Sequence, residues 1–245
     1  MTTRIVSPPL LPFLDPQALS GTLDHLLVGG EAWPQAMAER WVAGRHLYNA
    51  YGPSECAIIS TVGEYHAGAM RMDIGRALNN VELLVLDPEG RLVPPGIAGE
   101  LYIGGINVCN GYLNRPELTA ERFVPHPLTG DASLRFYRTG DLVRWLSNGH
   151  LEILGRLDHQ VKVAGHRLEL GEYEACIAQL TPVDGVVVLA LDLGRGQREL
   201  VAYVLTQTVA TGRMTETDLI AEIKAHVRRT LPVPLAEVLL MTEWP

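Results

Sequence analysis

The first 70 residues alternate short apolar runs with turn signals. An apolar run at 23–28 ends in two glycines, which predicts a short strand followed by a turn. Residues 34–41 start with a proline and continue with helix-forming side chains, so we expect a helix there. A second short strand is expected at 46–50, just before a Gly-Pro pair. Strand, helix and strand in this order predict a parallel α/β layer in residues 1–70.

Residues 71–157 change to short alternating segments separated by glycines, prolines and polar loops. This pattern predicts a β-rich subdomain, one form of which would be a small barrel. The expected strands are 81–86, 92–93, 100–103 and 151–154. We therefore expect an α/β layer followed by a β-rich subdomain in residues 1–157, and the family resemblance described below implies that these are the C-terminal portion of a large α/β layered domain.

Residues 158–245 mix strand-like and helix-like patterns in a segment long enough to fold alone. One helix is expected at 171–180, where acidic side chains occupy the first turn. A second is expected at 215–231, where apolar side chains recur on one side. The expected strands are 160–163, 167–170, 186–193 and 200–207. The predicted fold class of this part is a small α+β domain, and the family resemblance described below implies that it is a mobile C-terminal domain that is incomplete at its end.

Composition places the chain among soluble proteins with a packed core, because 47% of its 245 residues are apolar and 20% are charged. The net charge of −8 argues against binding to nucleic acid or to an anionic membrane, since both need a basic surface. A pocket for one nucleotide needs only a few local positive groups and is not excluded. No apolar run reaches membrane-spanning length. The three cysteines form no CxxC pair, which favours packing roles and a reducing cytoplasm.

The segment Asn-Ala-Tyr-Gly-Pro-Ser-Glu at 49–55 follows an expected strand. Ligands of α/β sheets bind beyond the carboxyl ends of the strands. Tyr51 offers a flat face to a nucleobase, Ser54 a hydroxyl to a phosphate, and Glu55 a hard oxygen ligand to Mg²⁺. The alternative interpretation is a tight turn in which glycine and proline supply the geometry and Glu55 caps a helix.

Two further segments carry candidate chemistry. Tyr-Arg-Thr-Gly-Asp at 137–141 places an acid after a glycine turn, where Asp141 would accept hydrogen bonds from both hydroxyls of a ribose. The alternative is an Asx turn in which Asp141 accepts only from neighbouring amides. The charged segment 155–172 lies where the β-rich pattern gives way to the last domain, so a hinge is expected there. Its alternative is a hairpin whose charged side chains are simply solvated.

Together these segments resemble the signature motifs of a known family. NAYGPSE at 49–55, YRTGD at 137–141 and GRLDHQVKVAGHRLELGEYE at 155–174 are similar, in the same order, to three motifs of the adenylate-forming, AMP-binding enzyme superfamily. GELYIGG at 99–105 and GYLNRPELTAERF at 111–123 resemble its amino-acid-activating branch, the adenylation domains of nonribosomal peptide synthetases. The resemblance extends over nearly the whole chain.

The resemblance implies an ATP-binding ligase of secondary-metabolite biosynthesis. Such enzymes condense an amino acid with ATP to an aminoacyl-adenylate and pyrophosphate. They then pass the acyl group to the phosphopantetheine thiol of a peptidyl carrier protein. The implied cofactors are ATP or AMP with Mg²⁺, and the implied partners are an amino acid and a carrier-protein domain, with no nucleic acid and no membrane.

The resemblance also implies which residues hold the nucleotide. They are Tyr51, Gly52, Ser54, Asp141 and Arg156. Tyr51 would stack on adenine and Ser54 would approach the phosphate, while Asp141 would hold the ribose hydroxyls with help from Arg156.

Two catalytic residues and a hinge follow from the same resemblance. Glu55 would bind the Mg²⁺ that accompanies ATP. Lys162 belongs to a loop, continuing through Gly165, that enters the site when the thioester forms. Asp158 would be the hinge about which the small C-terminal domain turns between the two half-reactions.

A substrate pocket is implied as well. Its lining residues are Leu27, Gly29, Ala50, Ile58 and Ile59. All five are apolar or small, so we expect an apolar substrate side chain, because a charged one would lack a partner among them. The alternative is that these residues form the ordinary core at the strand ends.

Two family motifs are not found in the chain: the glycine-rich phosphate loop with its lysine, and the closing Asn-Gly-Lys motif. We therefore expect a truncated member that is inactive alone, because both motifs stabilise the transition state. One alternative is a non-catalytic module that binds a nucleotide or docks a carrier protein. Another is a fragment of an acyl or aryl acid-CoA ligase. Residues 1–70 are expected to be poorly stable alone, since a parallel-sheet edge would be exposed, whereas residues 158–245 are expected to fold independently.

Overall fold

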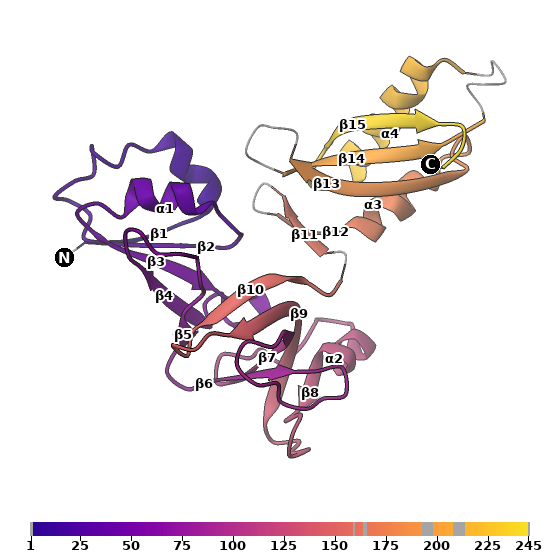
Figure 1. The fold of residues 1–245 in the computed structure, drawn as a ribbon. Coiled ribbons are helices and arrows are strands. Elements are labelled where there is room, and N and C mark those ends of the chain that lie inside the picture. Colours follow the sequence, from indigo (N-terminus) through magenta and orange to yellow (C-terminus); the bar gives the residue numbers. More distant parts are fainter. Residues whose placement is uncertain (1, 159, 164–165, 193–197, 208–213, 245) are drawn as a thin grey trace. The chain divides into compact units, whose positions relative to one another are not determined.

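The structure is a computed structural model that describes residues 2–158, 160–163, 166–192, 198–207 and 214–244. The chain divides into two compact units, the first ending at Asp158 and the second following it (Figure 1). Each unit has hydrophobic core clusters of its own.

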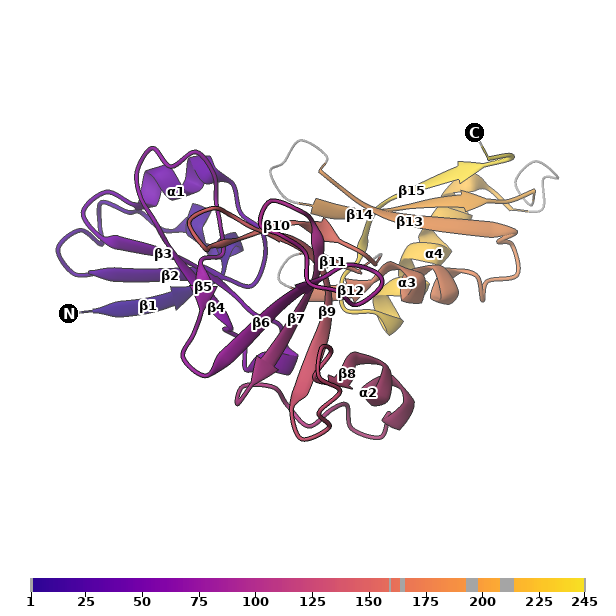
Figure 2. The ribbon, with the colours of Figure 1, turned by 60° about the horizontal axis from the view of Figure 1, so that its bottom comes forward.

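The first unit begins with a five-stranded sheet whose strands lie in chain order. The strands are β1 (Thr3–Val6), β2 (His25–Gly29), β3 (His46–Tyr51), β4 (Thr61–Tyr65) and β5 (Arg76–Ala77). β1, β2 and β3 are parallel, while β4 and β5 are antiparallel to their neighbours. Two 3-10 helices, η1 (Pro8–Phe13) and η2 (Ser54–Cys56), lie in the connections. The predicted parallel α/β layer is confirmed, and Figure 2 shows α1 (Gln35–Trp41) on one side of the parallel strands.

Alternating burial along β2, together with the buried Leu47 of β3, explains why this layer forms. Leu26, Val28 and Leu47 are buried with Ala38 and Trp41 of α1. Successive side chains of a strand point to opposite faces of the sheet, so alternate side chains pack against α1 and the others point away from it. Each buried aliphatic side chain contributes about 1.5–3 kcal/mol to folding. β1 was not expected because three of its four residues are exposed, and such a strand has no alternating signal.

The second sheet of the first unit is antiparallel and forms the predicted β-rich part. Its strands are β6 (Val81–Leu86), β7 (Gly99–Gly105), β9 (Arg135–Trp145) and β10 (Leu151–Arg156), in the order β10-β9-β7-β6, with β8 (Phe123–Pro125) also paired to β9. The short helix α2 (Pro116–Arg122) precedes β8. Within the described residues β6 and β10 do not pair, so the sheet is open rather than a barrel. Leu92, expected in a return strand, makes only an isolated bridge with Leu86.

The longest strand, β9, was missed by the sequence pattern. Its centre reads Arg-Thr-Gly-Asp, which has no apolar alternation and contains a glycine, a typical turn signal. In the structure Arg138 pairs with Glu100 of β7, with Nε 3.1 Å from a carboxylate oxygen, so the charges are compensated within the sheet. Cross-strand pairing that local sequence does not encode therefore decides this element.

The second unit packs two helices on a three-stranded sheet. The sheet contains β13 (Gly185–Asp192), β14 (Arg198–Leu205) and β15 (Leu235–Met241), and the helices are α3 (Leu170–Ile177) and α4 (Glu216–Thr230). A hairpin of β11 (Gln160–Val163) and β12 (His166–Glu169) precedes α3. β13 and β14 are antiparallel, whereas β14 and β15 are parallel. The small α+β domain is thus confirmed, although β15 was not predicted.

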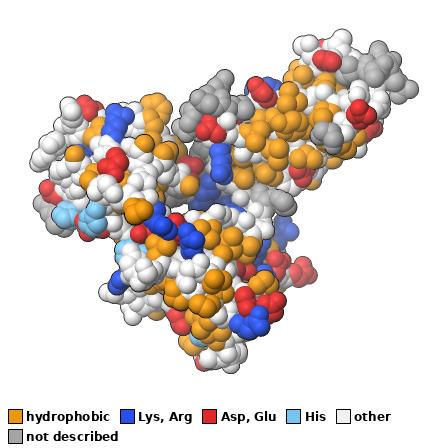
Figure 3. Space-filling view, in the orientation of Figure 1, with side chains coloured by type: hydrophobic (Ala, Val, Ile, Leu, Met, Phe, Trp, Pro, Cys, Tyr) orange, Lys and Arg blue, Asp and Glu red, His pale blue; other side chains and the backbone are white. Residues whose placement is uncertain are grey.

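One face of this three-stranded sheet packs against the helices. Val188, Leu200 and Val238 are buried there with Ile223 of α4. The neighbouring strand positions point the other way, and Val187 of β13 is exposed. Figure 3 shows hydrophobic side chains gathered over this part of the second unit.

No helix among the described residues is both long enough and apolar enough to span a membrane.

We expect urea unfolding to show two transitions, because the two units bury separate cores. Three of the four tryptophans, Trp33, Trp41 and Trp145, lie in the first unit. The first unit should unfold first, because its parallel sheet ends in the largely exposed edge strand β1. Tryptophan fluorescence should therefore report mainly the lower transition, whereas far-UV circular dichroism should report both. Residues 159–245 prepared alone should reproduce the upper transition. A single cooperative transition of the whole chain would contradict this prediction.

Thr215→Ala should lower the stability of the second unit by about 1 kcal/mol. Thr215 is the N-cap of α4, and its Oγ1 accepts a hydrogen bond of 3.1 Å from the backbone N–H of Asp218. Thr215→Ser keeps the acceptor and should be nearly neutral. The measurement is the midpoint of the upper urea transition, and an equal shift in both variants would assign the effect to something other than the cap.

Candidate functional site

The first motif lies in a tight loop that follows β3. The Ser60 N–H donates to the carbonyl of Tyr51 at 2.8 Å, which closes the loop back on the strand end. A side chain at Gly52 would place its Cβ 2.6 Å from the carbonyl oxygen of Ile58, so only glycine fits. Ala57 and Ile58 both have positive φ, of 53° and 73°. For a β-branched residue such as Ile58 this backbone conformation is strained, and strain of this kind clusters at functional loops.

The second motif lies in a bulge inside β9 rather than in a turn after a strand. Glu100 of β7 pairs with Leu142, and Tyr102 pairs with Arg138, so two steps on β7 correspond to four on β9. A bulge of this kind re-aims side chains out of the regular pleat. Thr139 holds it, because its Oγ1 donates to the carbonyl of Leu101 at 2.7 Å and accepts from the Asp141 N–H at 3.0 Å.

Asp141 is presented by this bulge and bound from two sides. The Tyr51 hydroxyl donates to Oδ2 at 2.5 Å, and Nη1 of Arg156 donates to Oδ1 at 2.6 Å. Both Tyr51 and Asp141 are only 9% exposed. Burial, together with the Asp141 charge, raises the pKa of Tyr51 well above its ordinary value. The hydroxyl therefore stays protonated and acts as the donor.

Arg156 connects Asp141 to Asp158. Its Nε and Nη2 donate to the two Asp158 oxygens at 2.6 and 2.7 Å, a bidentate pair, and Nη2 also donates to the carbonyl of Thr139 at 3.1 Å. Gly140 leaves room for this arrangement. It has a φ of 73°, and a Cβ there would lie 2.8 Å from Asp158 Oδ2. Glycine is therefore required at position 140 for two reasons: its positive φ, and the Arg156 guanidinium that lies close to where a Cβ would be.

Glu55 is buried and hydrogen-bonded to two tyrosines that sequence reasoning did not assign to the site. The hydroxyls of Tyr112 and Tyr137 donate to the same oxygen, Oε1, at 2.6 and 3.0 Å. Glu55 is 7% exposed. Burial and the bond to Glu55 raise the pKa of Tyr112, so it too remains a donor. The sequence did offer a signal for them, because Tyr112 and Tyr137 lie in the recognised segments 111–123 and 137–141.

The predicted pocket residues occupy two places. Leu27 and Gly29 lie on β2, two positions apart and therefore on one face, and Gly29 is in register with Ala50 of β3. Ile58 and Ile59 lie in the strained loop after η2, and Ile58 is 72% exposed. The structure therefore brings Gly29 and Ala50 together and leaves Ile58 largely open to solvent.

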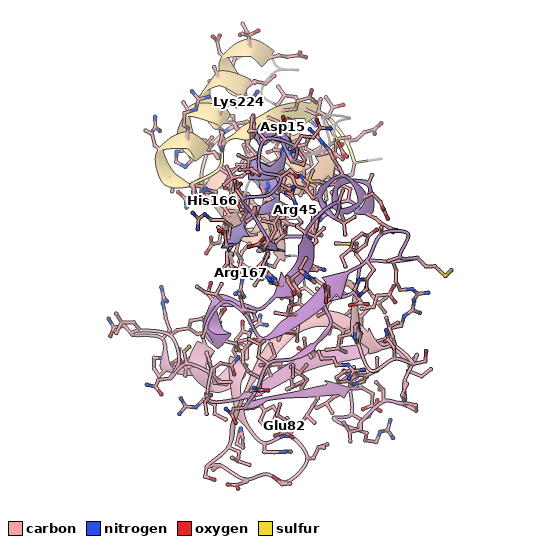
Figure 4. All side chains as sticks on the ribbon, turned by 90° about the vertical axis from the view of Figure 1, so that its left-hand side faces the viewer. Asp15, Arg45, Glu82, His166, Arg167 and Lys224 are labelled. Carbon is pink, nitrogen blue, oxygen red and sulfur yellow. The ribbon has the colours of Figure 1, made fainter. Side chains whose placement is uncertain are left out.

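The remaining predicted residues are placed as follows. Ser54 is exposed at the start of η2 in the first unit. Lys162 is half-buried on β11 of the second unit, in register with Arg167 of β12, which Figure 4 labels. Gly165, predicted in the same loop, lies outside the described residues.

A polar groove of about 730 Å³ lies elsewhere on the first unit, along β4 and the β9–β10 connection. Of the residues in the first two motifs, Asn49 lines it, whereas the acids Glu55 and Asp141 do not. Asn49 accepts from Trp33 Nε1 at 3.1 Å and donates to the Asp73 carbonyl at 2.8 Å. Its role in the motif is thus to anchor β3, a function that the sequence analysis did not assign.

Comparison with known proteins identifies the family of this site. The AMP-binding enzyme family matches residues 3–113. A linear gramicidin synthase polypeptide of Brevibacillus parabrevis is 46% identical over 217 residues, or 89% of this chain and 4% of that protein. Bacitracin synthase 3 of Bacillus licheniformis is 42% identical over 207 residues, or 84% of this chain and 3% of that protein.

Solved structures give the same result. The Vibrio cholerae adenylation domain AlmE, in complex with glycyl-adenosine-5′-phosphate, has a TM-score of 0.83 and 29% identity, covering 100% of this chain and 47% of that one. PA1221, a nonribosomal peptide synthetase protein with adenylation and PCP domains, has a TM-score of 0.80 and 26% identity, covering 99% and 48%. The chain thus spans about half the length of these solved chains and a few per cent of the synthetases. It belongs to the AMP-binding enzyme family and corresponds to the C-terminal part of a nonribosomal peptide synthetase adenylation domain.

Proposed function

We propose that the chain is the nucleotide-holding part of an enzyme that activates an amino acid. In the first half-reaction the amino-acid carboxylate attacks the α-phosphorus of ATP, forming an aminoacyl-adenylate and releasing pyrophosphate. The observation that carries the proposal is the buried Asp141 carboxylate, oriented by Tyr51 and Arg156. The related AlmE domain was solved with an aminoacyl-adenylate of this kind, which supports the assignment.

In this proposal the nucleotide is bound by the first unit. Asp141 accepts hydrogen bonds from the ribose hydroxyls, since each carboxylate oxygen has a second lone pair beyond the one used by its present donor. Arg156 orients the carboxylate and compensates its charge. Tyr51, which is 9% exposed, contacts adenine, and Ser54 at the exposed start of η2 approaches the phosphate.

Glu55 would hold the Mg²⁺ that arrives with ATP. Mg²⁺ takes hard oxygen ligands and is commonly bound through one or two carboxylates plus substrate phosphates. Glu55 fits this chemistry, because it is a carboxylate whose Oε1 is held in place by the Tyr112 and Tyr137 hydroxyls. The bound ion would neutralise phosphate charge, while the protein keeps the carboxylate in place.

The second half-reaction would transfer the acyl group to a carrier-protein thiol. PA1221 joins an adenylation domain to a PCP domain, which supports such a partner. Asp158, the last residue of the first unit, would be the hinge, and Lys162 would act from the second unit. The bidentate Arg156–Asp158 pair would fix the first-unit side of that hinge.

The substrate side chain is proposed to be apolar. Leu27, Gly29, Ala50 and Ile59 are apolar or small, and Ile58 presents an exposed apolar side chain from a strained backbone. A charged substrate would find no compensating charge among these five residues. We place the reaction in the cytoplasm, since the three cysteines are free thiols.

A second candidate is a module that holds a nucleotide without reacting it. Residues 1–245 contain no glycine-rich Ser/Thr loop with a lysine to clamp pyrophosphate, which favours this candidate for the isolated chain. An acid-CoA ligase fragment is less well supported, because linear gramicidin synthase and bacitracin synthase 3 are 46% and 42% identical to this chain.

Asp141→Asn should weaken AMP binding by about 10- to 100-fold, because it replaces a charged acceptor of the ribose hydroxyls with a neutral one. Isothermal titration calorimetry measures the affinity. Asp131→Asn is the matched control, since Asp131 is an exposed loop acid whose Oδ1 accepts from Ser133. Equal AMP affinity in the wild-type chain and in Asp141→Asn would contradict the ribose role.

The 245-residue chain alone should give no amino-acid-dependent exchange of pyrophosphate into ATP, because the chain has no pyrophosphate clamp. A panel of apolar amino acids is assayed with a complete adenylation domain as positive control. Exchange by the isolated chain would exclude the non-catalytic candidate and show that the residues present are sufficient for the first half-reaction.

A further inference from the structure

The first two motifs share a spacing that the structure makes meaningful. Each contains a tyrosine four residues before an acid: Tyr51 and Glu55 in one, Tyr137 and Asp141 in the other. The hydrogen bonds run crosswise. Tyr51 donates to Asp141 at 2.5 Å, and Tyr137 donates to Glu55 at 3.0 Å. Each motif thus supplies the hydroxyl that holds the acid of the other.

We propose that Tyr51 and Tyr137 are positioning residues, each orienting through its hydroxyl the carboxylate of the opposite motif. Tyr51 would set the ribose acid, and Tyr137, with Tyr112, would set the acid that meets Mg²⁺. The inference rests on the proposed function, because it concerns the same two acids. It adds a role for the Tyr51 hydroxyl that stacking on adenine does not require.

The sheet topology explains why such crossed bonds are needed. β3 and β9 belong to different sheets, so no shared backbone ladder fixes the position of one motif relative to the other. Tyr51 and Tyr137 do lie in one hydrophobic cluster, but apolar packing is not directional. Two buried hydroxyl–carboxylate bonds are directional, and they constrain both segments at once.

The chemistry of the donors differs between the two acids in a useful way. Asp141 has a hydroxyl on one oxygen and the Arg156 guanidinium on the other, which suits an acid that accepts from neutral ribose hydroxyls. Glu55 Oε1 accepts from two tyrosine hydroxyls, which are neutral donors. The tyrosines therefore orient each carboxylate without changing its charge.

Two affinity ratios measure the two acids separately. The ribose ratio is the Kd for 2′,3′-dideoxy-AMP divided by the Kd for AMP. The magnesium ratio is the Kd for ATP in EDTA divided by the Kd for ATP with Mg²⁺. Because each is a ratio within one variant, a general loss of folded protein cancels.

Tyr51→Phe should lower the ribose ratio by about fivefold or more and leave the magnesium ratio near its wild-type value, because the variant loses only the hydroxyl that orients Asp141. Tyr137→Phe should do the reverse. Tyr65→Phe is the matched control, since the Tyr65 hydroxyl donates to Glu39 at 2.5 Å outside this site. It should change neither ratio.

The outcomes separate the two proposals. If Tyr51→Phe and Tyr137→Phe lower both ratios equally, or if neither lowers its own ratio, the positioning roles are wrong while the nucleotide site stands. The proposed function is wrong if the wild-type chain binds no nucleotide, or if its ribose ratio and its magnesium ratio are both equal to one. The positioning roles are then wrong with it. Should Tyr137→Phe fail to fold, as urea unfolding would reveal, Tyr112→Phe removes the other hydroxyl from Glu55 Oε1 and must lower the magnesium ratio alone.

Discussion

The candidate site depends on the stabilisation of one buried carboxylate. Asp141 lies in the β9 bulge, where a negative charge is costly unless donors surround it. Those donors come from distant parts of the chain: the Tyr51 hydroxyl from β3 and the Arg156 guanidinium from β10. The Asp141 charge can therefore be buried only when folding of the first unit has brought the motifs at 49–55 and 137–141 together. A ligand would meet a carboxylate that is already oriented, so little reorganisation is needed on binding.

One of these donors, Arg156, also connects the site to the last residue of the first unit. Arg156 bonds both Asp141 and Asp158, and Gly140 leaves the space that the guanidinium occupies. A residue with a side chain at position 140 would lie against Arg156 and Asp158, so the glycine and the two ion pairs depend on one another. The acid proposed to hold a ribose and the acid proposed as hinge are thus parts of one hydrogen-bonded cluster.

Much of the fold followed from local patterns. The patterns at 81–86 and 46–50 are typical of short strands, and the structure contains both as β6 and β3. Strands whose pattern is broken were not found. β9 is interrupted by Arg-Thr-Gly-Asp, and β1 is almost wholly exposed. Their positions come from pairing with partners far along the chain, which a window of neighbouring residues cannot report.

The sequence by itself determined the family and singled out Glu55 and Asp141 as the two candidate acids, because the motifs that contain them are recognisable from residue type and order alone. Only the tertiary structure decided what holds those acids. Tyr112 and Tyr137 reach Glu55, and Tyr51 reaches Asp141, across sequence separations of 57, 82 and 90 residues. The physical reason is that a hydrogen bond needs a donor within about 3 Å and in the right direction. Sequence spacing alone does not specify that geometry between strands of different sheets.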